Sequence, residues 1–155
     1  MKSEDLVFKT ETPFVGMLVI WINPLNYEEK ILLTKDYEKF KIRLPGGGFE
    51  LKEGDKDLLD TAVRELREET GLRAEKTDFD FIVKFTRPSD QGGEHEKFFF
   101  SIIIVQETEP KIIKGKEVRT ARWNSKGEIE RLIQERQISR DHAEALSVFF
   151  KNRKE

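Results

Sequence analysis

The sequence contains no cysteine and no long hydrophobic run. Without cysteine, the chain cannot form disulfides, thiolate metal sites or a cysteine nucleophile. No apolar run approaches the ~20 residues that a transmembrane helix needs. The first twelve residues include Lys2, Glu4 and Asp5 and lack the apolar stretch of a secretory signal. We therefore expect a cytoplasmic protein that has no membrane partner.

Excess charge of either sign is also missing. The formal net charge is −2 at pH 7, and 37% of the residues are charged while 37% are hydrophobic. This balance gives no support to a general nucleic-acid surface, so an anionic ligand has to be held locally by arginines, backbone amides or a bridging cation. A chain of 155 residues is the size of one globular domain. We expect residues 1–155 to form a single domain.

The hydrophobic pattern predicts both strands and helices. Residues 14–22 are almost uninterruptedly apolar, which is typical of a strand buried on both faces. Further strands are expected at 31–34, 79–86, 97–105 and 118–123, and helices at 57–70, 126–136 and 141–152. Asp141 is the predicted N-cap of the last helix. Pro45 and three glycines predict a loop over 42–55. The expected fold class is α/β, with a mixed sheet between helices.

Three glutamates share one stripe of the helix predicted at 57–70. Glu65, Glu68 and Glu69 are separated by three and four positions, so their carboxylates project from the same side. Like charges at this spacing repel by roughly 0.2–0.5 kcal/mol per pair, so helix stability does not explain them. Mg²⁺ takes oxygen ligands and commonly combines carboxylates with water and substrate phosphates. The alternative is that these are solvated surface glutamates, paired with Arg64 and Arg67.

Gly46, Gly47 and Gly48 precede this acidic helix. Because glycine lacks a Cβ, the backbone of such a segment can approach a ligand closely. Backbone amides, a helix N-terminus and a bound cation together suit a diphosphate. We therefore predict that the three glycines bind substrate, and this favours a metal-binding role for the glutamates.

The run from Arg64 to Leu72, RELREETGL, resembles the second half of the Nudix box, whose pattern is REUxEExGU with U apolar. Every fixed position matches. The resemblance implies a MutT-like Nudix hydrolase with an αβα sandwich, a small-molecule nucleotide substrate and Mg²⁺, with Mn²⁺ as the alternative cofactor. It implies Glu65, Glu68 and Glu69 as metal ligands, with Gly47 as a candidate carbonyl ligand. Arg64 is implied as a catalytic residue that orients the carboxylates.

The first half of the box departs from the family pattern, which has a glycine, five residues, a glutamate and seven residues before the arginine. Counting back from Arg64 places Lys56 at the glutamate position and Glu50 at the glycine position. If Gly48 is taken as the box glycine, the segment up to Arg64 is two residues longer than usual. The candidates for the missing carboxylate are Glu50, Glu53 and Asp55.

The resemblance implies one more acid on a distant loop, several residues before a large residue in an ARW-like segment. Glu117, six residues before Trp123, matches that placement and is predicted to bind metal or act as a base. The candidates for the general base, in order of preference, are Glu65, Glu117 and Glu53. The only two histidines, His95 and His142, are expected at the surface rather than in catalysis.

The substrate is less defined than the chemistry. Pro88, sixteen residues beyond Leu72, resembles in its placement a proline of ADP-ribose-cleaving members. On this ground ADP-ribose or a nucleotide sugar is slightly favoured over nucleoside triphosphates and dinucleoside polyphosphates. Aromatic side chains that could stack on a base, although aromatics in strands more often belong to a core, are Phe14, Trp21, Phe85 and Phe98–Phe100.

Two other classes of function stay open at this point. One is a non-catalytic Nudix-like sensor that binds a nucleotide metabolite, against which the complete set of helix glutamates argues. The other is a protein-interaction domain. A homodimer is also open, because members of the family that the sequence resembles are often dimers.

Overall fold

The structure is a computed structural model that describes residues 6–37 and 41–153. Its strands are β1 (Phe14–Ile22), β2 (Glu29–Asp36), β3 (Ile42–Arg43), β4 (Gly46–Gly48), β5 (Phe79–Pro88), β6 (Glu94–Val105) and β7 (Val118–Asn124). Its helices are α1 (Leu58–Thr70), α2 (Lys126–Gln134) and α3 (Arg140–Arg153), with 3₁₀ helices at Leu51–Glu53 and Lys76–Asp78. The predicted strands and helices are all present. None of the described helices is both long and apolar enough to cross a bilayer.

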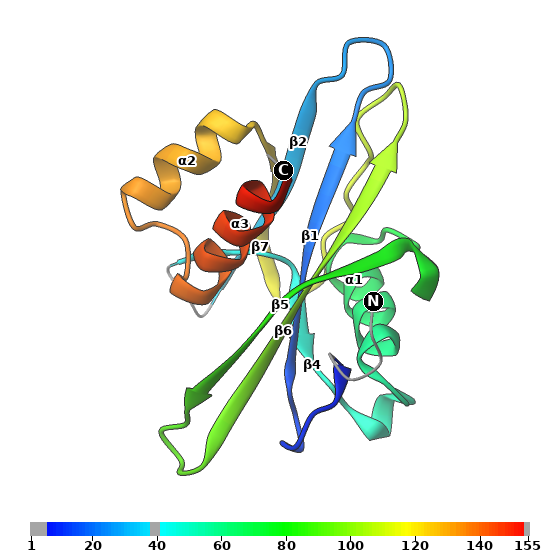
Figure 1. The fold of residues 1–155 in the computed structure, drawn as a ribbon. Helices are drawn as coiled ribbons and strands as arrows, with labels where there is room; N and C mark the ends of the chain where they lie inside the picture. The colour runs from blue at the N-terminus through cyan, green and yellow to red at the C-terminus, as the bar shows by residue number, and fades with distance from the viewer. Residues whose placement is uncertain (1–5, 38–40, 154–155) are drawn as a thin grey trace.

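The seven strands form one mixed sheet in the order β3-β2-β1-β6-β5, in which β4 also pairs with β1 and β7 with β2 (Figure 1). β1 runs parallel to β6 from Phe14↔Lys97 to Ile22↔Val105, and the other strand pairs are antiparallel. All seven inner residues of β1 are buried, as the sequence predicted. A central strand that is covered on both faces reads as a continuous apolar run.

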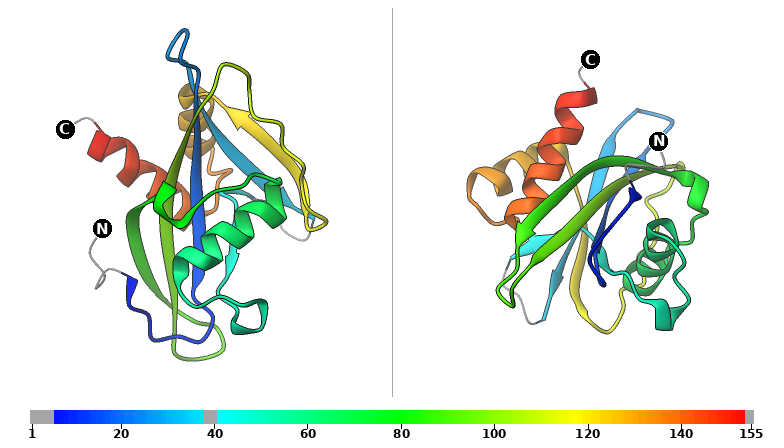
Figure 2. Two further views of the ribbon diagram at one scale, coloured as in Figure 1. Left: turned by 90° about the vertical axis from the view of Figure 1, so that its right-hand side faces the viewer. Right: turned by 60° about the horizontal axis from the view of Figure 1, so that its bottom comes forward.

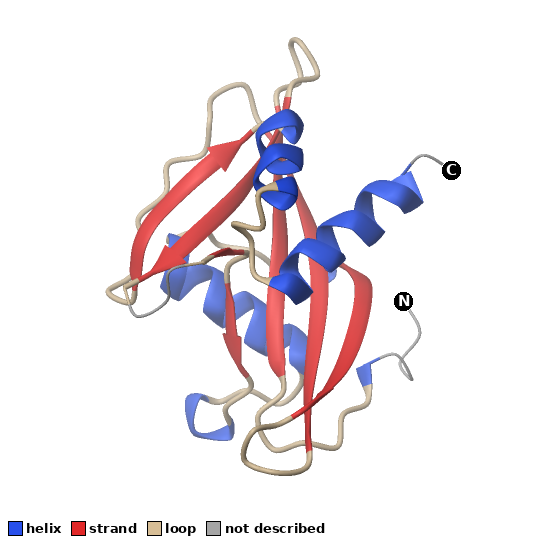
Figure 3. Ribbon diagram, turned by 90° about the vertical axis from the view of Figure 1, so that its left-hand side faces the viewer, coloured by secondary structure: helices blue, strands red, loops and turns tan. Residues whose placement is uncertain are grey.

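Helices cover both faces of the sheet (Figures 2 and 3). On one face α1 contributes Leu58, Ala62 and Leu66 to a core cluster with side chains of the central strands, among them Met17, Phe98 and Phe100. On the other face α2 and α3 contribute Ile129, Ala145 and Leu146 to a cluster with Leu18, Ile20, Leu33 and Phe99. The expected αβα sandwich is confirmed. Phe98–Phe100 belong to the core and have no exposed ring to offer a ligand.

The α1 helix has clear start and stop residues. The Asp57 side chain accepts a hydrogen bond from the Asp60 amide, which satisfies a backbone donor that the helix itself leaves unpaired. Gly71 adopts φ 76° and its N–H donates to the Arg67 carbonyl, a backbone conformation that glycine adopts at little cost. These two residues fix the position of the acidic stripe along the helix.

The prediction of a loop over 42–55 was wrong in part. The segment contains β3 and β4, and β4 consists of Gly46–Gly48, which pair with Phe14–Gly16 of β1. A Cβ added to Gly46 would lie 2.2 Å from the Val15 carbonyl oxygen. Gly46 is therefore required by the close approach of β4 to β1, and a glycine run can form a strand where tertiary packing demands one.

Asp141 was wrongly predicted as the N-cap of α3. The helix begins one residue earlier, at Arg140, and Asp141 lies within its first turn. The Asp141 carboxylate pairs instead with Lys97 at 2.8 Å and with Arg87 at 2.9 Å. These two ion pairs attach the start of α3 to β5 and β6.

Candidate active site

A cavity of about 440 Å³ opens between α1, β4 and the start of α3. It brings the predicted glycines together with Glu65 and Glu69 of α1. The other residues that line it are Phe14, Asp36, Arg43, Glu50, His95, Lys97, Glu117, Ser139, Arg140, Asp141 and His142. Residues far apart in the sequence thus line one cavity. A ligand bound there would contact the acidic helix.

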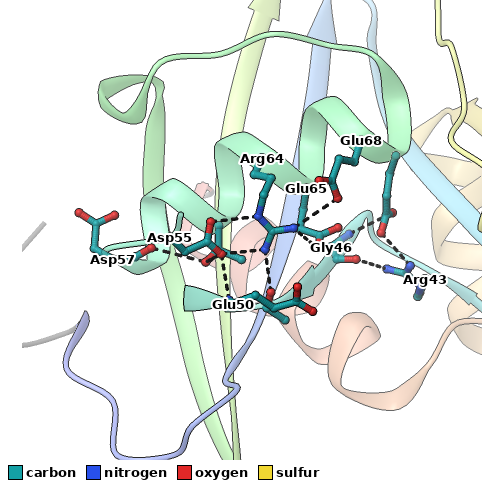
Figure 4. A network of polar contacts seen from close by, with 11 residues as sticks. Arg43, Gly46, Glu50, Asp55, Asp57, Arg64, Glu65 and Glu68 are labelled. Atoms are coloured by element: carbon teal, nitrogen blue, oxygen red, sulfur yellow. Dashed lines mark hydrogen bonds and ion pairs between the residues drawn. The ribbon is translucent and has the colours of Figure 1, made fainter. Parts of the chain in front are cut away.

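Arg64 connects the acidic stripe of α1 to β4 (Figure 4). Its Nη1 donates to Glu65 Oε1 at 3.0 Å and to Glu68 Oε2 at 3.3 Å. Its Nη2 donates to the Gly48 carbonyl at 2.9 Å. Two of the three helix glutamates are thereby held by one guanidinium, which offsets their mutual repulsion.

Asp55 is the one among the three candidates for the missing box carboxylate that pairs with Arg64. It is 3% exposed, and it also accepts hydrogen bonds from the Glu50 amide and the Thr61 hydroxyl. Burial acts to raise the pKa of Asp55, but the hydrogen bonds from Arg64, Glu50 and Thr61 outweigh it and lower that pKa. Asp55 is therefore a charged, fully engaged partner of Arg64. Glu53 is exposed and lines a separate hollow on the outer side of Arg64.

Glu69 is the most buried of the three helix glutamates, with 8% exposure. Its Oε1 accepts from Arg43 Nη2 at 3.0 Å, and its Oε2 accepts from the Gly46 amide at 3.2 Å. Burial raises the pKa of Glu69 to about 7, against the opposing attraction of Arg43. The sequence analysis missed Arg43, because nothing in the spacing links β3 to the far end of α1.

Glu65 lies directly against β4, and a Cβ added to Gly47 would lie 2.2 Å from its Oε1. Burial raises the pKa of Glu65, against the attraction of Arg64. Glu68 differs from both neighbours, because its side chain is 52% exposed and does not line the cavity. The structure thus directs two of the three predicted ligands into the cavity, whereas the third lines the separate hollow that Glu53 also lines.

The described residues contain no group of three or more acidic or histidine side chains already arranged around one point, as a closed metal site would require. Arg64 and Arg43 hold the carboxylates instead. A hard cation such as Mg²⁺ is commonly held by one or two carboxylates while water and substrate phosphates supply its remaining oxygens. Glu65 and Glu69, which line the same cavity, fit that requirement.

Glu117 is exposed just before β7 and lines the same cavity as Glu65 and Glu69. Its segment is attached to the end of α1, because the Ile113 amide donates to Thr70 O at 2.8 Å and the Gly115 amide to Glu69 O at 3.1 Å. Three other acids between α1 and Glu117, namely Glu94, Glu96 and Glu107, do not line the cavity. The fold therefore brings Glu117 to the same cavity as Glu65 and Glu69, although it lies far from them in the sequence.

The sequence profile of the NUDIX domain family matches residues 15–147. The chain belongs to the Nudix family. The predicted family is thus confirmed. No curated protein sequence matches this Nudix chain significantly.

Solved structures share the fold of this Nudix chain at low sequence identity. The NUDIX domain of Shewanella oneidensis NrtR, complexed with ADP ribose, has a TM-score of 0.71 and 16% identity over 94% of this chain and 90% of that one. A bifunctional NMN adenylyltransferase/ADP ribose pyrophosphatase from Francisella tularensis, complexed with AMP and a Mn ion, has a TM-score of 0.69 and 21% identity over 94% and 42% of the two chains. A MutT/nudix family protein from Enterococcus faecalis has a TM-score of 0.61 and 22% identity over 76% and 44%. This chain thus spans less than half of the last two proteins.

The wall opposite the acidic helix of this Nudix domain comes from α3, β1 and β6. His142, expected at the surface, is 6% exposed, so that expectation was wrong. The Leu44 amide donates to its Nδ1 at 3.1 Å, and its ring lies 5.3 Å from that of Phe14. The first turn of α3 packs against the backbone between β3 and β4, and this contact buries the imidazole. His95 is partly exposed and lines the cavity.

Arg140 is an exposed cation on this opposite wall. Lys97 on the same wall is paired with Asp141 at 2.8 Å, whereas Arg140 makes no ion pair with any residue that the structure describes. Pro88, the basis of the substrate prediction, lies at the exposed end of β5 and does not line the cavity. Among the aromatic residues predicted to stack on a base, Phe14 lines the cavity. Trp21 is buried instead and donates to Gln106 O.

Proposed function

We propose that this chain is a divalent-metal-dependent pyrophosphohydrolase that cleaves a nucleoside diphosphate linked to a second moiety. The observation that carries the proposal is the cavity in which Glu65 and Glu69 lie against the glycines of β4. An acidic wall next to a glycine backbone suits a substrate diphosphate that binds through a cation. ADP-ribose or a nucleotide sugar is our preferred substrate, with nucleoside triphosphates and dinucleoside polyphosphates as the alternatives.

We assign Mg²⁺, with Mn²⁺ as the alternative, to Glu65, Glu69 and Glu117 at the cavity and to Glu68, which neighbours Glu69 on α1 but lies outside the cavity. When bound, such a cation supplies charge neutralisation for the phosphates and a water of lowered pKa. The Mn ion in the Francisella enzyme supports a divalent cation in a protein of this fold. Glu68 is half exposed and held only at the end of its side chain by Arg64, so it can turn toward the cavity at little cost.

We assign the general base to Glu65. It lies in the cavity, and burial raises its pKa, which makes the carboxylate a stronger proton acceptor. Glu117 is the second candidate because it lines the same cavity, and Glu53 is the third because it lies outside it. Arg64, which contacts Glu65, Glu68 and the Gly48 carbonyl, orients the carboxylates relative to β4.

The second moiety of the substrate is assigned to the opposite wall. Phe14 offers a ring to a sugar or a base, and Arg140 offers a cation that no described side chain neutralises. A guanidinium binds phosphate or sugar hydroxyls through its fixed set of donors. The ADP ribose bound by the Shewanella domain, which shares this fold over most of both chains, supports this class of ligand.

A nucleotide panel assayed with Mg²⁺ tests the proposal. The panel contains ADP-ribose, NADH, diadenosine polyphosphates, GDP-mannose, 8-oxo-dGTP and the ordinary triphosphates, with release of the nucleoside monophosphate as the readout. We expect turnover that requires the divalent cation, with ADP-ribose or a nucleotide sugar as the best substrate. Thermal stabilisation by a nucleotide without any turnover would instead identify a metabolite sensor. A preference for triphosphates would contradict the proposed substrate class but would agree with the proposed pyrophosphohydrolase reaction.

A further inference from the structure

Arg43 uses its whole guanidinium to connect three parts of the structure. Nε and Nη2 donate to the two carboxylate oxygens of Asp36 at 2.9 and 3.0 Å. Nη1 donates to the carbonyls of Leu44 and Gly46, and Nη2 also donates to Glu69 Oε1 at 3.0 Å. All five N–H groups of the side chain are therefore engaged. Such a guanidinium is fixed in position and in orientation.

Arg64 has the same set of contacts at the other end of β4. Each arginine makes a two-point ion pair with an aspartate, donates to a carbonyl of β4 and binds a glutamate of α1. Figure 4 shows Arg43 beside Gly46, whereas Arg64 lies nearer to Glu50. Only Arg64 belongs to the Nudix motif. Arg43 repeats its geometry from a strand that the motif does not include.

We propose that Arg43 is a positioning residue for Glu69, which holds that carboxylate in the orientation in which it binds the catalytic cation. The inference rests on the proposed function, because it needs Glu69 to be a ligand. Asp36 holds the guanidinium in place, and the guanidinium in turn holds Glu69 Oε1. The Gly46 amide fixes Oε2.

Positioning and simple charge screening predict opposite results when the guanidinium is removed. If Arg43 only supplied positive charge, its loss would leave cation binding to an ionised Glu69 unchanged or make it tighter, because less repulsion would act on the cation. The comparison is therefore made at alkaline pH, where the Glu69 carboxylate is ionised with or without the guanidinium. If Arg43 orients Glu69, its loss should weaken cation binding by about 10-fold to 100-fold, the usual effect of removing a partner of a metal ligand.

The test measures Mn²⁺ binding to the substrate-free chain by electron paramagnetic resonance, together with kcat and KM for the best substrate. The variants are Arg43→Gln, Arg43→Lys, Glu69→Gln and Thr34→Val. Thr34 is the matched structural control, because its buried hydroxyl donates to the Arg43 carbonyl and leaves the guanidinium untouched. We expect Arg43→Gln to weaken Mn²⁺ binding about tenfold or more and to lower kcat by a similar factor, with KM changed less than about threefold. Thr34→Val should bind Mn²⁺ like the parent.

Arg43→Lys keeps the charge and loses the two-point geometry, so we expect it to bind Mn²⁺ more weakly than the parent. If circular dichroism shows that Arg43→Gln does not fold, Mn²⁺ binding by Arg43→Lys is the measurement that tests the proposal. Parent-like or tighter Mn²⁺ binding by a folded Arg43 variant overturns the positioning role, as does equal weakening in Thr34→Val. If Glu69→Gln itself binds Mn²⁺ like the parent, then the metal assignment under the proposed function is at fault, and the role of Arg43 falls with it.

Discussion

Arg64 donates two parallel hydrogen bonds to Asp55, from Nε to Oδ1 at 3.0 Å and from Nη2 to Oδ2 at 2.7 Å. The aspartate is shorter than the glutamate of the family motif, and it has six residues instead of five between itself and Gly48 and eight instead of seven between itself and Arg64. The 3₁₀ helix at Leu51–Glu53 turns the chain before Asp55, and Asp55 pairs with the arginine. The altered spacing in the sequence therefore still leaves Arg64 with a carboxylate partner, Asp55, in the structure.

The first prediction concerns this pair. Asp55→Asn leaves the largely buried Arg64 without its main counter-charge, so we expect it to lower the free energy of unfolding by about 3 kcal/mol. Urea denaturation followed by circular dichroism measures the change. Glu53→Gln is the matched control: its side chain is exposed, and its stability should stay within about 0.5 kcal/mol of the parent. A parent-like stability of Asp55→Asn would contradict the structural role given to the pair.

The second prediction concerns pH and Glu69 in the metal-free chain. Its pKa is about 7 in the folded state and 4.5 ordinarily, so the folded state binds more protons between these two values. The stability of the parent should therefore fall as pH rises from about 4.5 to 7, by roughly 1.4 kcal/mol for each unit of pKa difference.

Glu69→Gln cannot ionise, so its melting temperature should fall less over that range than that of the parent. At pH 7 and above, the variant should be as stable as the metal-free parent or more stable, with most of the activity lost. Mg²⁺ should raise the melting temperature of the parent, because it binds only the folded site, and raise that of the variant much less. Identical pH profiles of the two proteins would sink the prediction.

The third prediction concerns Glu117. We expect Glu117→Gln to lower kcat by about 100-fold, which is typical of acid/base catalysis, with an unchanged free energy of unfolding because the side chain is exposed. Glu107→Gln, an exposed acid away from the cavity, should keep the activity of the parent. Steady-state kinetics with the best substrate provides the measurement. Activity of Glu117→Gln within a few-fold of the parent would remove Glu117 from the site.

The fourth prediction concerns Glu96, which is 2% exposed and attaches the N-terminal segment to β6. Its Oε1 accepts from the Lys9 and Thr10 amides at 2.8 and 2.7 Å, and its Oε2 pairs with Lys84 at 2.8 Å. Burial acts to raise the pKa of Glu96, but Lys84 and the two amides lower it to about 2.

A lowered folded pKa stabilises the chain above the ordinary value, and this stabilisation is lost as pH falls. The difference in unfolding free energy between the parent and Glu96→Gln should therefore be largest above pH 4.5 and should shrink toward pH 2. Thermal melts at several pH values would show this. A difference that stays constant with pH would mean that the carboxylate charge is not what attaches the segment.

The fifth prediction concerns Arg140 on the wall opposite α1. If its guanidinium binds the second moiety of the substrate, Arg140→Gln should raise KM about tenfold, which corresponds to one charged hydrogen bond, and should change kcat little. Arg131→Gln, an exposed arginine on α2, is the control and should leave both constants unchanged. A lower kcat with unchanged KM would place Arg140 in the chemical step instead of in binding.

Local sequence rules were sufficient for α1. The hydrophobic pattern predicted a helix at 57–70, and the structure has it at Leu58–Thr70 with Asp57 as its N-cap. The spacing of three and four residues placed Glu65 and Glu69 on one stripe, and both line the cavity. These features depend on contacts within a few residues, so the sequence could predict them.

Features that depend on distant contacts could not be predicted. Arg43 of β3 meets Glu69 of α1 through tertiary packing between segments 26 residues apart, and no local pattern encodes that contact. His142 is buried by the docking of α3 on the backbone near Leu44, although a histidine on an amphipathic helix is compatible with either environment. The choice of Asp55 over Glu50 and Glu53 required the path of the segment before α1.

The three glycines of β4 differ in how much variation they can accept. Gly46 lies against the β1 backbone and Gly47 against the Glu65 carboxylate, whereas a Cβ on Gly48 would meet nothing within 4 Å. A side chain at the first position would push β4 from the sheet, and one at the second would displace a proposed ligand. A library randomised at all three positions and selected for activity should therefore retain the first two glycines and accept many residues at the third.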